Sequence, residues 1–239
     1  EIPLRLVGSE MCIRDRPNTI STYMRMLRSI YNRGVDMHQA PYVHGLFRDV
    51  FTGVDTRQKK AIPIGELHML LNKDPQSEKL RRTQAIANLL FQFCGMPFSD
   101  LAHLEKSNLE RGLLKYNRTK TGTPMSIEVL ESAQNAIGGL YNKSDARSSG
   151  YPDYLFRILS GAYKRNEEGA YREYQSALRR FNNELKSLSR KLRLHSPVTS
   201  YTLRHSWATT AKYRGVPIEM ISESLAVSYT HLTLPTICS

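Results

Sequence analysis

The sequence predicts a mainly helical protein with one small antiparallel β-sheet, an α+β fold. Apolar residues recur at three- and four-residue spacing through most of the chain, which is typical of amphipathic helices. Between 107 and 130 the pattern changes to two strand-like runs around a glycine-containing turn. The 239 residues, 40% of them hydrophobic, are enough to bury one sizeable core, or one domain and part of another.

Eight segments have helical character. They cover residues 18–35, 63–71, 78–93, 98–105, 130–141, 167–191, 200–213 and 217–225. In the first segment Tyr23, Leu27 and Ile30 follow the helical repeat and predict one apolar face. The 167–191 segment is long and basic, and Pro197 bars its continuation because proline has no backbone N–H to donate.

The strand-like runs lie in LLKYNRTKTGTPMSIEV and predict a β-hairpin that turns at Thr121, Gly122 and Thr123. Residues 36–62 contain scattered proline and glycine, so we expect a linker between two units there. The Ser/Gly/Pro-rich stretch 142–153 predicts a loop.

The formal charge of +12 suits a polyanionic partner. The excess is concentrated in residues 157–214, where thirteen Lys and Arg stand against four Glu. Such a one-sided segment predicts a phosphate-facing surface, although the charge alone leaves open a soluble basic protein without a specific partner.

The three cysteines have no regular spacing, which argues against a disulfide framework and against a zinc knuckle. No apolar run approaches the ~20 residues that span a bilayer, and the N-terminus lacks a secretory pattern. These features predict a soluble, intracellular protein with no membrane partner.

Both ends of the sequence look foreign to the rest. Residues 4–16 have no usable periodicity, and residues 226–239 interrupt a helical pattern in mid-turn. We interpret 1–16 and 226–239 as artefacts that resemble translated adapter sequence, although ordinary disordered tails are the alternative. Cys12 and Cys238 fall in these ends. The remaining chain divides into 17–57 and 58–225.

Three segments carry residues suited to chemistry. They are FCGMPFSDLAHL at 93–104, RTKTG at 118–122 and TSYTLRHSWAT at 199–209. Each alone has a structural explanation: a packed helix corner, a hairpin with a solvated lysine, and a capped helix whose Trp207 fills the core.

Together, in this order and spacing, the three segments resemble the catalytic domain of tyrosine recombinases, the phage integrase family. The resemblance is greatest to integrases of Bacteroides-type mobile elements, whose segments read R-G-M-x-F-x-D-L-x-x-L, K-T-G and Y/H-x-x-R-H-S-W-A. Residues 19–32 also resemble the end of the family's helical, SAM-like core-binding domain. The resemblance covers 17–225 and implies a catalytic domain, truncated at its C-terminus, behind a remnant of the core-binding domain.

The implied reaction is site-specific DNA strand cleavage and rejoining. A tyrosine hydroxyl attacks a phosphodiester, leaving a 3′-phosphotyrosine and a 5′-hydroxyl, so the bond energy is kept and no cofactor or metal is required. Arginine suits the extra negative charge of the transition state because its planar fork can hold two oxygens. A lysine on a hairpin can protonate the leaving oxygen.

The resemblance assigns roles residue by residue. Arg204 matches the second catalytic arginine and Lys120 the hairpin lysine, a candidate general acid. Tyr201 takes the place of a histidine that donates to a phosphate oxygen, and Asp100 occupies the acidic position that braces the site. The residues expected to bind DNA are Lys120, Arg118, Arg204 and His205.

The sequence departs from the family at two places. Cys94 stands where the family has its first catalytic arginine, and no basic partner is evident to make Cys94 a nucleophile in its own right. Residues 218–225 resemble the helix that leads to a G-H dipeptide and the nucleophilic tyrosine. Tyr229 comes too early to be that residue, so we expect this chain to bind double-stranded DNA without cutting it.

We expect the intact protein to act as a homotetramer on two duplexes, in the bacterial cytoplasm at the nucleoid. Two other interpretations remain open. A non-catalytic DNA-binding regulator would use 200–225 as a helix-turn-helix pair, but it has no need of the K-T-G hairpin. A structural, partner-binding helical module would require an acidic partner for the basic segment.

Overall fold

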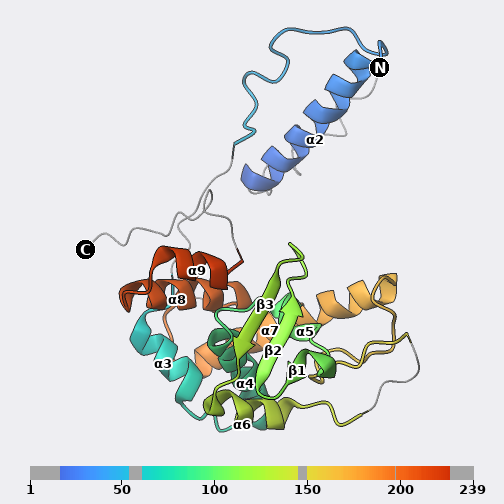
Figure 1. The fold of residues 1–239 in the computed structure, drawn as a ribbon. Coiled ribbons are helices and arrows are strands. Elements are labelled where there is room, and N and C mark those ends of the chain that lie inside the picture. Colours follow the sequence, from blue (N-terminus) through green and yellow to red (C-terminus); the bar gives the residue numbers. More distant parts are fainter. Residues whose placement is uncertain (1–16, 54–60, 145–149, 197, 227–239) are drawn as a thin grey trace. The chain divides into compact units, whose positions relative to one another are not determined.

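The computed structural model describes residues 17–53, 61–144, 150–196 and 198–226 (Figure 1). Two compact units divide the chain, Glu1–Gln58 and Lys59–Ser239. The first contains one described helix. The second contains the remaining helices and the sheet, and it holds all three of the segments with candidate chemistry.

The first unit is built on α2 (Pro17–Asp36), an amphipathic helix as the spacing predicts. The chain then folds back along it. The Tyr31 hydroxyl donates to the Pro41 carbonyl at 2.8 Å, and the Ser21 hydroxyl donates to the Gly53 carbonyl at 2.6 Å. Polar side chains of α2 thus hold residues 37–53 against the helix. The boundary between the two units, after Gln58, falls inside the 36–62 stretch where a linker was expected.

The second unit confirms the predicted fold class, since it is mostly helical with one small antiparallel sheet. Its helices are α3 (Ile64–Asn72), α4 (Glu78–Gln92), α5 (Phe98–Ala102), the 3-10 turn η2 (Lys106–Asn108), α6 (Glu131–Leu140), α7 (Glu168–Lys191), α8 (Ser200–Tyr213) and α9 (Ile218–Ser224). The fourth predicted helix is shorter than expected and ends at Ala102. Within the described ranges, no helix is both long and apolar enough to cross a membrane.

The sheet has three strands in the order β1 (Leu109–Glu110), β2 (Leu113–Asn117) and β3 (Pro124–Glu128), all antiparallel. The hairpin of β2 and β3 was predicted, whereas the short β1 was not. Leu114 and Tyr116 point into the core while Lys115 and Asn117 are exposed, which is the alternation that a strand with one buried face requires.

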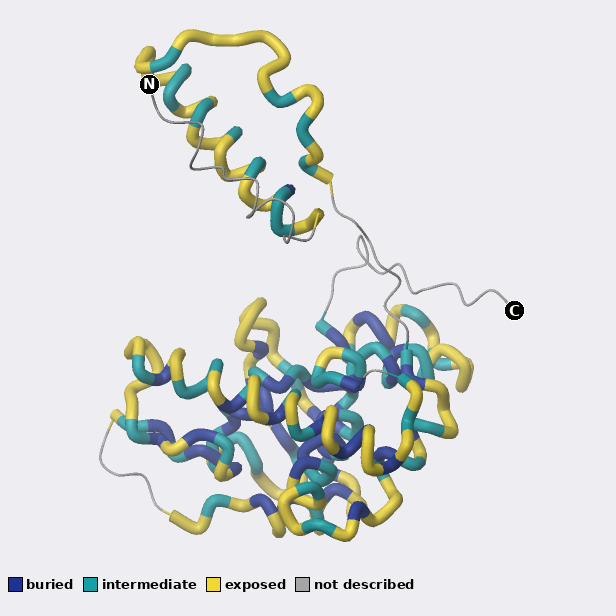
Figure 2. Tube along the Cα trace, turned by 180° about the vertical axis from the view of Figure 1, so that it is seen from behind, coloured by how far each residue is buried: buried dark blue, intermediate teal, exposed yellow. Residues whose placement is uncertain are grey.

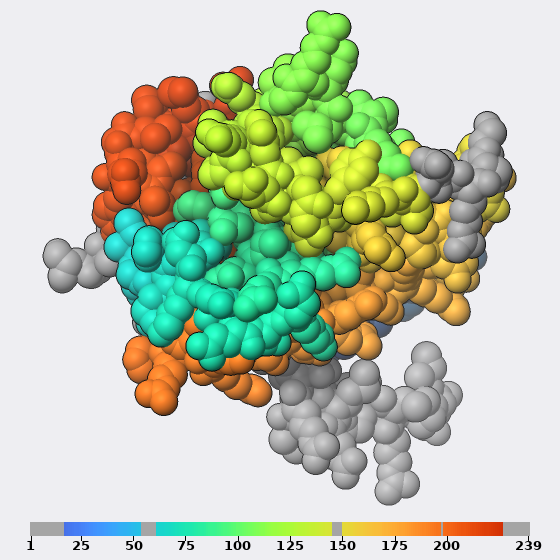
Figure 3. Space-filling view, turned by 90° about the horizontal axis from the view of Figure 1, so that it is seen from below, coloured from blue at the N-terminus to red at the C-terminus, as the bar shows by residue number. Residues whose placement is uncertain are grey.

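Helix α4 lies at the centre of the unit and contacts α3, α6, α7 and α8. Its Leu89 and Leu90 are fully buried in a core that also includes residues of α5, β2, β3 and α7. Figure 2 shows this buried interior in dark blue, and Figure 3 shows α4 beside α7 on one face. A smaller cluster of Ala208, Ile221 and Leu225 joins α8 to α9.

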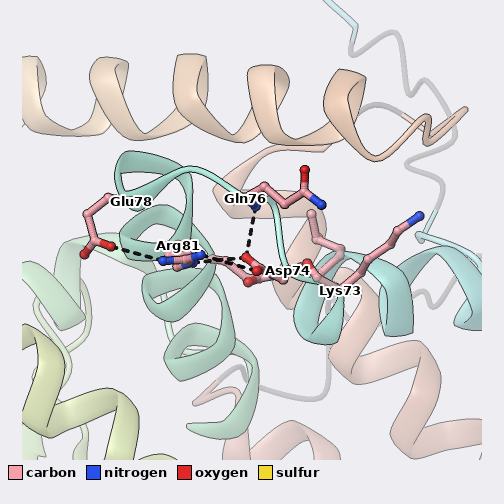
Figure 4. A network of polar contacts seen from close by, with 7 residues as sticks. Lys73, Asp74, Gln76, Glu78 and Arg81 are labelled. Carbon is pink, nitrogen blue, oxygen red and sulfur yellow. Dashed lines mark hydrogen bonds and ion pairs between the residues drawn. The ribbon is translucent and has the colours of Figure 1, made fainter.

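The turn between α3 and α4 is closed by polar contacts at the surface (Figure 4). Arg81 pairs with Asp74 at 3.0 Å and with Glu78 at 3.4 Å, and the Gln76 amide donates to the Asp74 carboxylate at 2.9 Å. These groups are solvent-exposed, so they fix the shape of the turn more than they stabilise the fold.

Candidate functional site

The first two sequence segments meet at Asp100. Its carboxylate pairs with the Arg118 guanidinium, Oδ2 to Nε, at 2.9 Å, and its Oδ1 accepts the Thr119 amide at 3.2 Å. Asp100 is 3% exposed and Arg118 is 7% exposed. Helix α5 is therefore tied to the base of the β2–β3 hairpin, immediately before Lys120.

The third segment, residues 199–209, forms the N-terminal cap and most of α8. The Thr199 side chain accepts the Thr202 amide at 3.2 Å and caps this helix, as its Ser/Thr-rich start predicts. This places Arg204 in the early part of the helix, where its Nη1 donates to the Gly95 carbonyl at 2.8 Å and its Nη2 donates to the Leu225 carbonyl. Arg204 thus connects the 93–104 segment with the end of α9.

Arg118 and Arg204 share one acceptor. The Arg118 Nη1 donates to the same Leu225 carbonyl at 2.9 Å. Two guanidinium groups from segments far apart in the sequence therefore converge on a single oxygen atom. This arrangement has the composition of an anion site, because arginine forks are the side chains best matched to carboxylate and phosphate oxygens.

The turn after α4 makes this convergence possible. Cys94 and Gly95 both have left-handed backbone conformations, with φ of 55° and 67°. A Cβ on Gly95 would lie 3.3 Å from the Arg204 Cα and 3.2 Å from the Trp207 Cβ. Only glycine allows this close approach of α8 at a positive φ without strain. Gly95 was not among the candidate residues predicted from the sequence, because it has no side chain that could carry chemistry.

Burial sets the electrostatics of the cluster. Desolvation is the main cause that lowers the pKa of Arg204 to about 10, and the charge of Arg118 lowers it further, while Asp100 opposes the shift. The guanidinium remains charged at neutral pH. Desolvation, together with the charge of Asp100, raises the pKa of the neighbouring Tyr116 hydroxyl, so Tyr116 stays neutral.

Cys94 lies at the edge of this cluster, where the family has an arginine. Burial raises the pKa of its thiol, which keeps the side chain in the unreactive thiol form. Position 94 thus contributes a neutral thiol and no guanidinium to the cluster.

The remaining candidates are Lys120 and Tyr201, which are exposed, and His205, which is half-buried. Lys120 is exposed in the hairpin turn. Tyr201 is 51% exposed, and its ring packs edge-on against His205 with ring centroids 4.4 Å apart. Tyr201 and His205 therefore form a pair in the first half of α8, beside Arg204 in the sequence. Tyr229, Cys12 and Cys238 lie outside the described residues.

The structure adds detail to two expectations from the sequence. Arg118, one of the residues expected to bind DNA, has a buried side chain that pairs with Asp100 and donates to the Leu225 carbonyl, and its binding of DNA stays a prediction. Within the basic segment 157–214, which was expected to form a phosphate-facing surface, Arg165 borders a cavity of about 470 Å³ beside Asp100. Arg157 and Arg180 border another cavity of about 420 Å³ between α4 and α7. The contact of this segment with phosphate stays a prediction.

The sequence matches a known protein family and a curated relative. The sequence profile of the phage integrase family matches residues 64–232. A curated relative, named "Probable integrase/recombinase protein" in Methanocaldococcus jannaschii, is 26% identical over 194 residues, which cover 78% of this chain and 55% of that protein. The chain thus spans about half the length of this relative.

Two solved structures resemble the fold. The Tn1549 transposon integrase in complex with circular intermediate DNA is 15% identical with a TM-score of 0.58, covering 96% of this chain and 76% of that one. A lambda integrase dimer bound to a COC′ core site is 12% identical with a TM-score of 0.58, covering 89% and 57%. At such low identities, the structural similarity shows a shared fold and nothing more.

Proposed function

This chain belongs to the phage integrase family, and from that premise we propose that it is the DNA-facing part of a site-specific recombinase. The intact protein would cleave and rejoin strands of double-stranded DNA through a 3′-phosphotyrosine. More specifically, we propose that it is an integrase of a Bacteroides-type mobile element and that it acts in the bacterial cytoplasm, at the nucleoid.

One observation carries this proposal. The three segments with candidate chemistry are far apart in the sequence, and they meet around Asp100, Arg118 and Arg204. A helical module that merely packs or caps its helices has no need to place one buried and one half-buried arginine beside an exposed hairpin lysine, because buried charge costs free energy unless it is used or paired.

The proposed reaction assigns each group a task. Arg204 holds a non-bridging phosphate oxygen as negative charge builds up on phosphorus. A tyrosine oxygen forms the new bond to phosphorus while the bond to the 5′ oxygen breaks, and Lys120 gives that oxygen its proton. We expect this tyrosine C-terminal to α9, outside the described residues.

The other candidates support these groups. Tyr201 would donate a hydrogen bond to a second phosphate oxygen, and His205 would hold the Tyr201 ring in place through their edge-on contact. Asp100 would fix the hairpin through Thr119 and the Arg118 side chain. The chemistry asks for no metal and no cofactor, because the phosphotyrosine keeps the energy of the broken bond.

The proposed partner is duplex DNA, with a homotetramer on two duplexes as the working assembly. Among proteins of similar fold, lambda integrase has been solved as a tetramer bound to a Holliday junction. The formal charge of +12 is of the sign that such a partner requires.

The first test is an electrophoretic shift of this chain with duplex DNA at low and at moderate salt. We expect binding at low salt that weakens steeply as salt rises and depends little on sequence, because phosphate contacts release counterions. Absence of any shift at low salt would refute DNA binding by this chain.

The regulator interpretation is not favoured. A helix-turn-helix protein would present the polar residues of α8 to base edges, whereas Arg204 is turned inward to the Gly95 and Leu225 carbonyls. A repaired protein that carries the family's C-terminal tyrosine separates the two interpretations. A recombinase forms a covalent adduct with DNA and a regulator does not.

A further inference from the structure

The oxygen shared by Arg118 and Arg204 belongs to a helix end. Leu225 is the C-terminal cap residue of α9, and carbonyls at this position carry the partial negative charge of the helix. The acceptor between the two guanidinium groups is therefore an anion-like oxygen, supplied by the protein's own backbone.

Each arginine divides its contacts in the same way. Arg118 keeps its Nε on Asp100 and Arg204 keeps its Nη1 on the Gly95 carbonyl, and neither acceptor is shared. A second nitrogen of each guanidinium, Nη1 of Arg118 and Nη2 of Arg204, donates to the Leu225 carbonyl. Both side chains would thus stay in place if another oxygen replaced that carbonyl.

The Leu225 side chain, which helps to hold the Leu225 carbonyl in place, packs in a small apolar cluster. Leu225 is 5% exposed and belongs to the minor cluster with Ala208 and Ile221, against which Trp207, Ala211 and Val216 also pack. The next residue, Ala226, has φ of 46°, a conformation that disfavours residues other than glycine. Apart from its hydrogen bonds, the end of α9 is thus held by one small apolar cluster, and an unfavourable backbone conformation follows it.

We propose that the Leu225 carbonyl is a place-holder for a phosphate oxygen, so that the end of α9 and a phosphate compete for Arg118 and Arg204. This assigns Arg118 as the second phosphate ligand of a site that has no arginine at position 94. Binding of phosphate then releases the end of α9. The inference rests on the proposed function, because that function supplies the phosphodiester.

A purely structural role makes the opposite prediction. If the two arginines only cap α9, loosening the helix end should leave anion binding unchanged or weaken it. If the helix end competes with phosphate, loosening it should tighten binding, because the competent state becomes more populated.

The test uses the full chain with inorganic phosphate as the probe, against chloride at equal ionic strength. Phosphate affinity is measured by NMR from the shifts of the arginine side-chain N–H groups, and release of the helix end from amide exchange at Leu225 and Ala226. In the wild type we expect phosphate to shift both arginines and to speed exchange at these two amides.

Two variants should move the affinity in opposite directions. Leu225→Ala removes the apolar anchor and keeps the carbonyl, so phosphate should bind about tenfold more tightly. Ala226→Gly favours the observed φ and stabilises the helix end, so phosphate should bind about threefold more weakly. Ile158→Ala, which trims a partly buried residue packed against the main core and not against the small cluster, is the matched control and should leave the affinity unchanged.

Arg118→Lys keeps the charge but loses the fork, and should weaken phosphate binding about tenfold, while Arg111→Lys, an exposed arginine between β1 and β2, should not. Phosphate binding that leaves Leu225 and Ala226 exchange unchanged, or no tightening in Leu225→Ala and no weakening in Ala226→Gly, overturns the inference. Failure of duplex binding alone counts against the proposed function and not against this competition.

Discussion

Gly95 lies so close to Arg204 that a single added carbon would meet the backbone of α8. The Cβ position is 3.3 Å from both the Arg204 Cα and the Arg204 carbonyl oxygen. The same glycine accepts the hydrogen bond that holds the Arg204 guanidinium. Backbone shape at one residue therefore sets both the position of the helix and the direction of its arginine.

Gly95→Ala should destabilise the second unit because the methyl group meets α8 at a positive φ. Gly122→Ala is the matched control, since Gly122 has φ of 70° and nothing within 4 Å of its Cβ position. Urea unfolding should show a loss at Gly95 that exceeds the loss at Gly122 by roughly 1–3 kcal/mol. Equal losses would show that only the backbone conformation matters.

Asp100→Asn should leave the buried Arg118 charge without its partner. Breaking such a buried pair typically costs about 3–5 kcal/mol of unfolding free energy, and we expect a value near the lower end because asparagine can still accept the Thr119 amide. Asp74→Asn breaks the exposed pair with Arg81 and should change stability little. The comparison is made by chemical denaturation, and similar small effects in both variants would contradict a stabilising role for the buried pair.

Arg204→Ala should abolish strand cleavage in a repaired protein that carries the family's C-terminal tyrosine. Loss of a preorganised donor to the transition state typically costs about 10²–10³ in rate. Arg214→Ala removes an exposed arginine at the end of the same helix and should leave the rate nearly unchanged. The readout is the yield of covalent phosphotyrosine adduct per unit time, and an undiminished yield in Arg204→Ala would refute the assignment.

Lys120→Ala should slow cleavage in the same repaired protein because the leaving 5′ oxygen loses its proton donor. A substrate with sulfur in place of that oxygen leaves readily without a proton, so it should restore most of the rate. Lys115→Ala, on the exposed face of β2, provides the control. A defect that persists with the sulfur substrate would show that Lys120 binds DNA instead of donating a proton.

Cys94 should react slowly with alkylating reagents at neutral pH. The thiolate is the reactive form, and burial raises the pKa of this thiol above its usual value. Its reaction rate should therefore be low at neutral pH and climb only at alkaline pH, later than that of a free thiol. Peptide mass spectrometry after timed alkylation measures this for the peptide that contains Cys94, and rapid labelling at neutral pH would indicate an activated cysteine.

Much of this protein is determined by the sequence alone. The apolar repeat predicts the helices, and the β-hairpin follows from strand-like runs around Gly122. The positions of Asp100, Lys120 and Arg204 follow from three local motifs. These features depend on residues close together in the chain, so they can be read without knowledge of the fold.

Tertiary structure decided what surrounds those residues. Arg118 is an ordinary hairpin arginine in the sequence, and only packing shows that it is buried against Asp100. The Gly95 and Leu225 carbonyls that bind Arg204 carry no residue-type signature, because every residue has a carbonyl. Which backbone oxygen meets which guanidinium is set by how α4, α8 and α9 pack, and the physical reason is that such contacts join positions far apart in the chain.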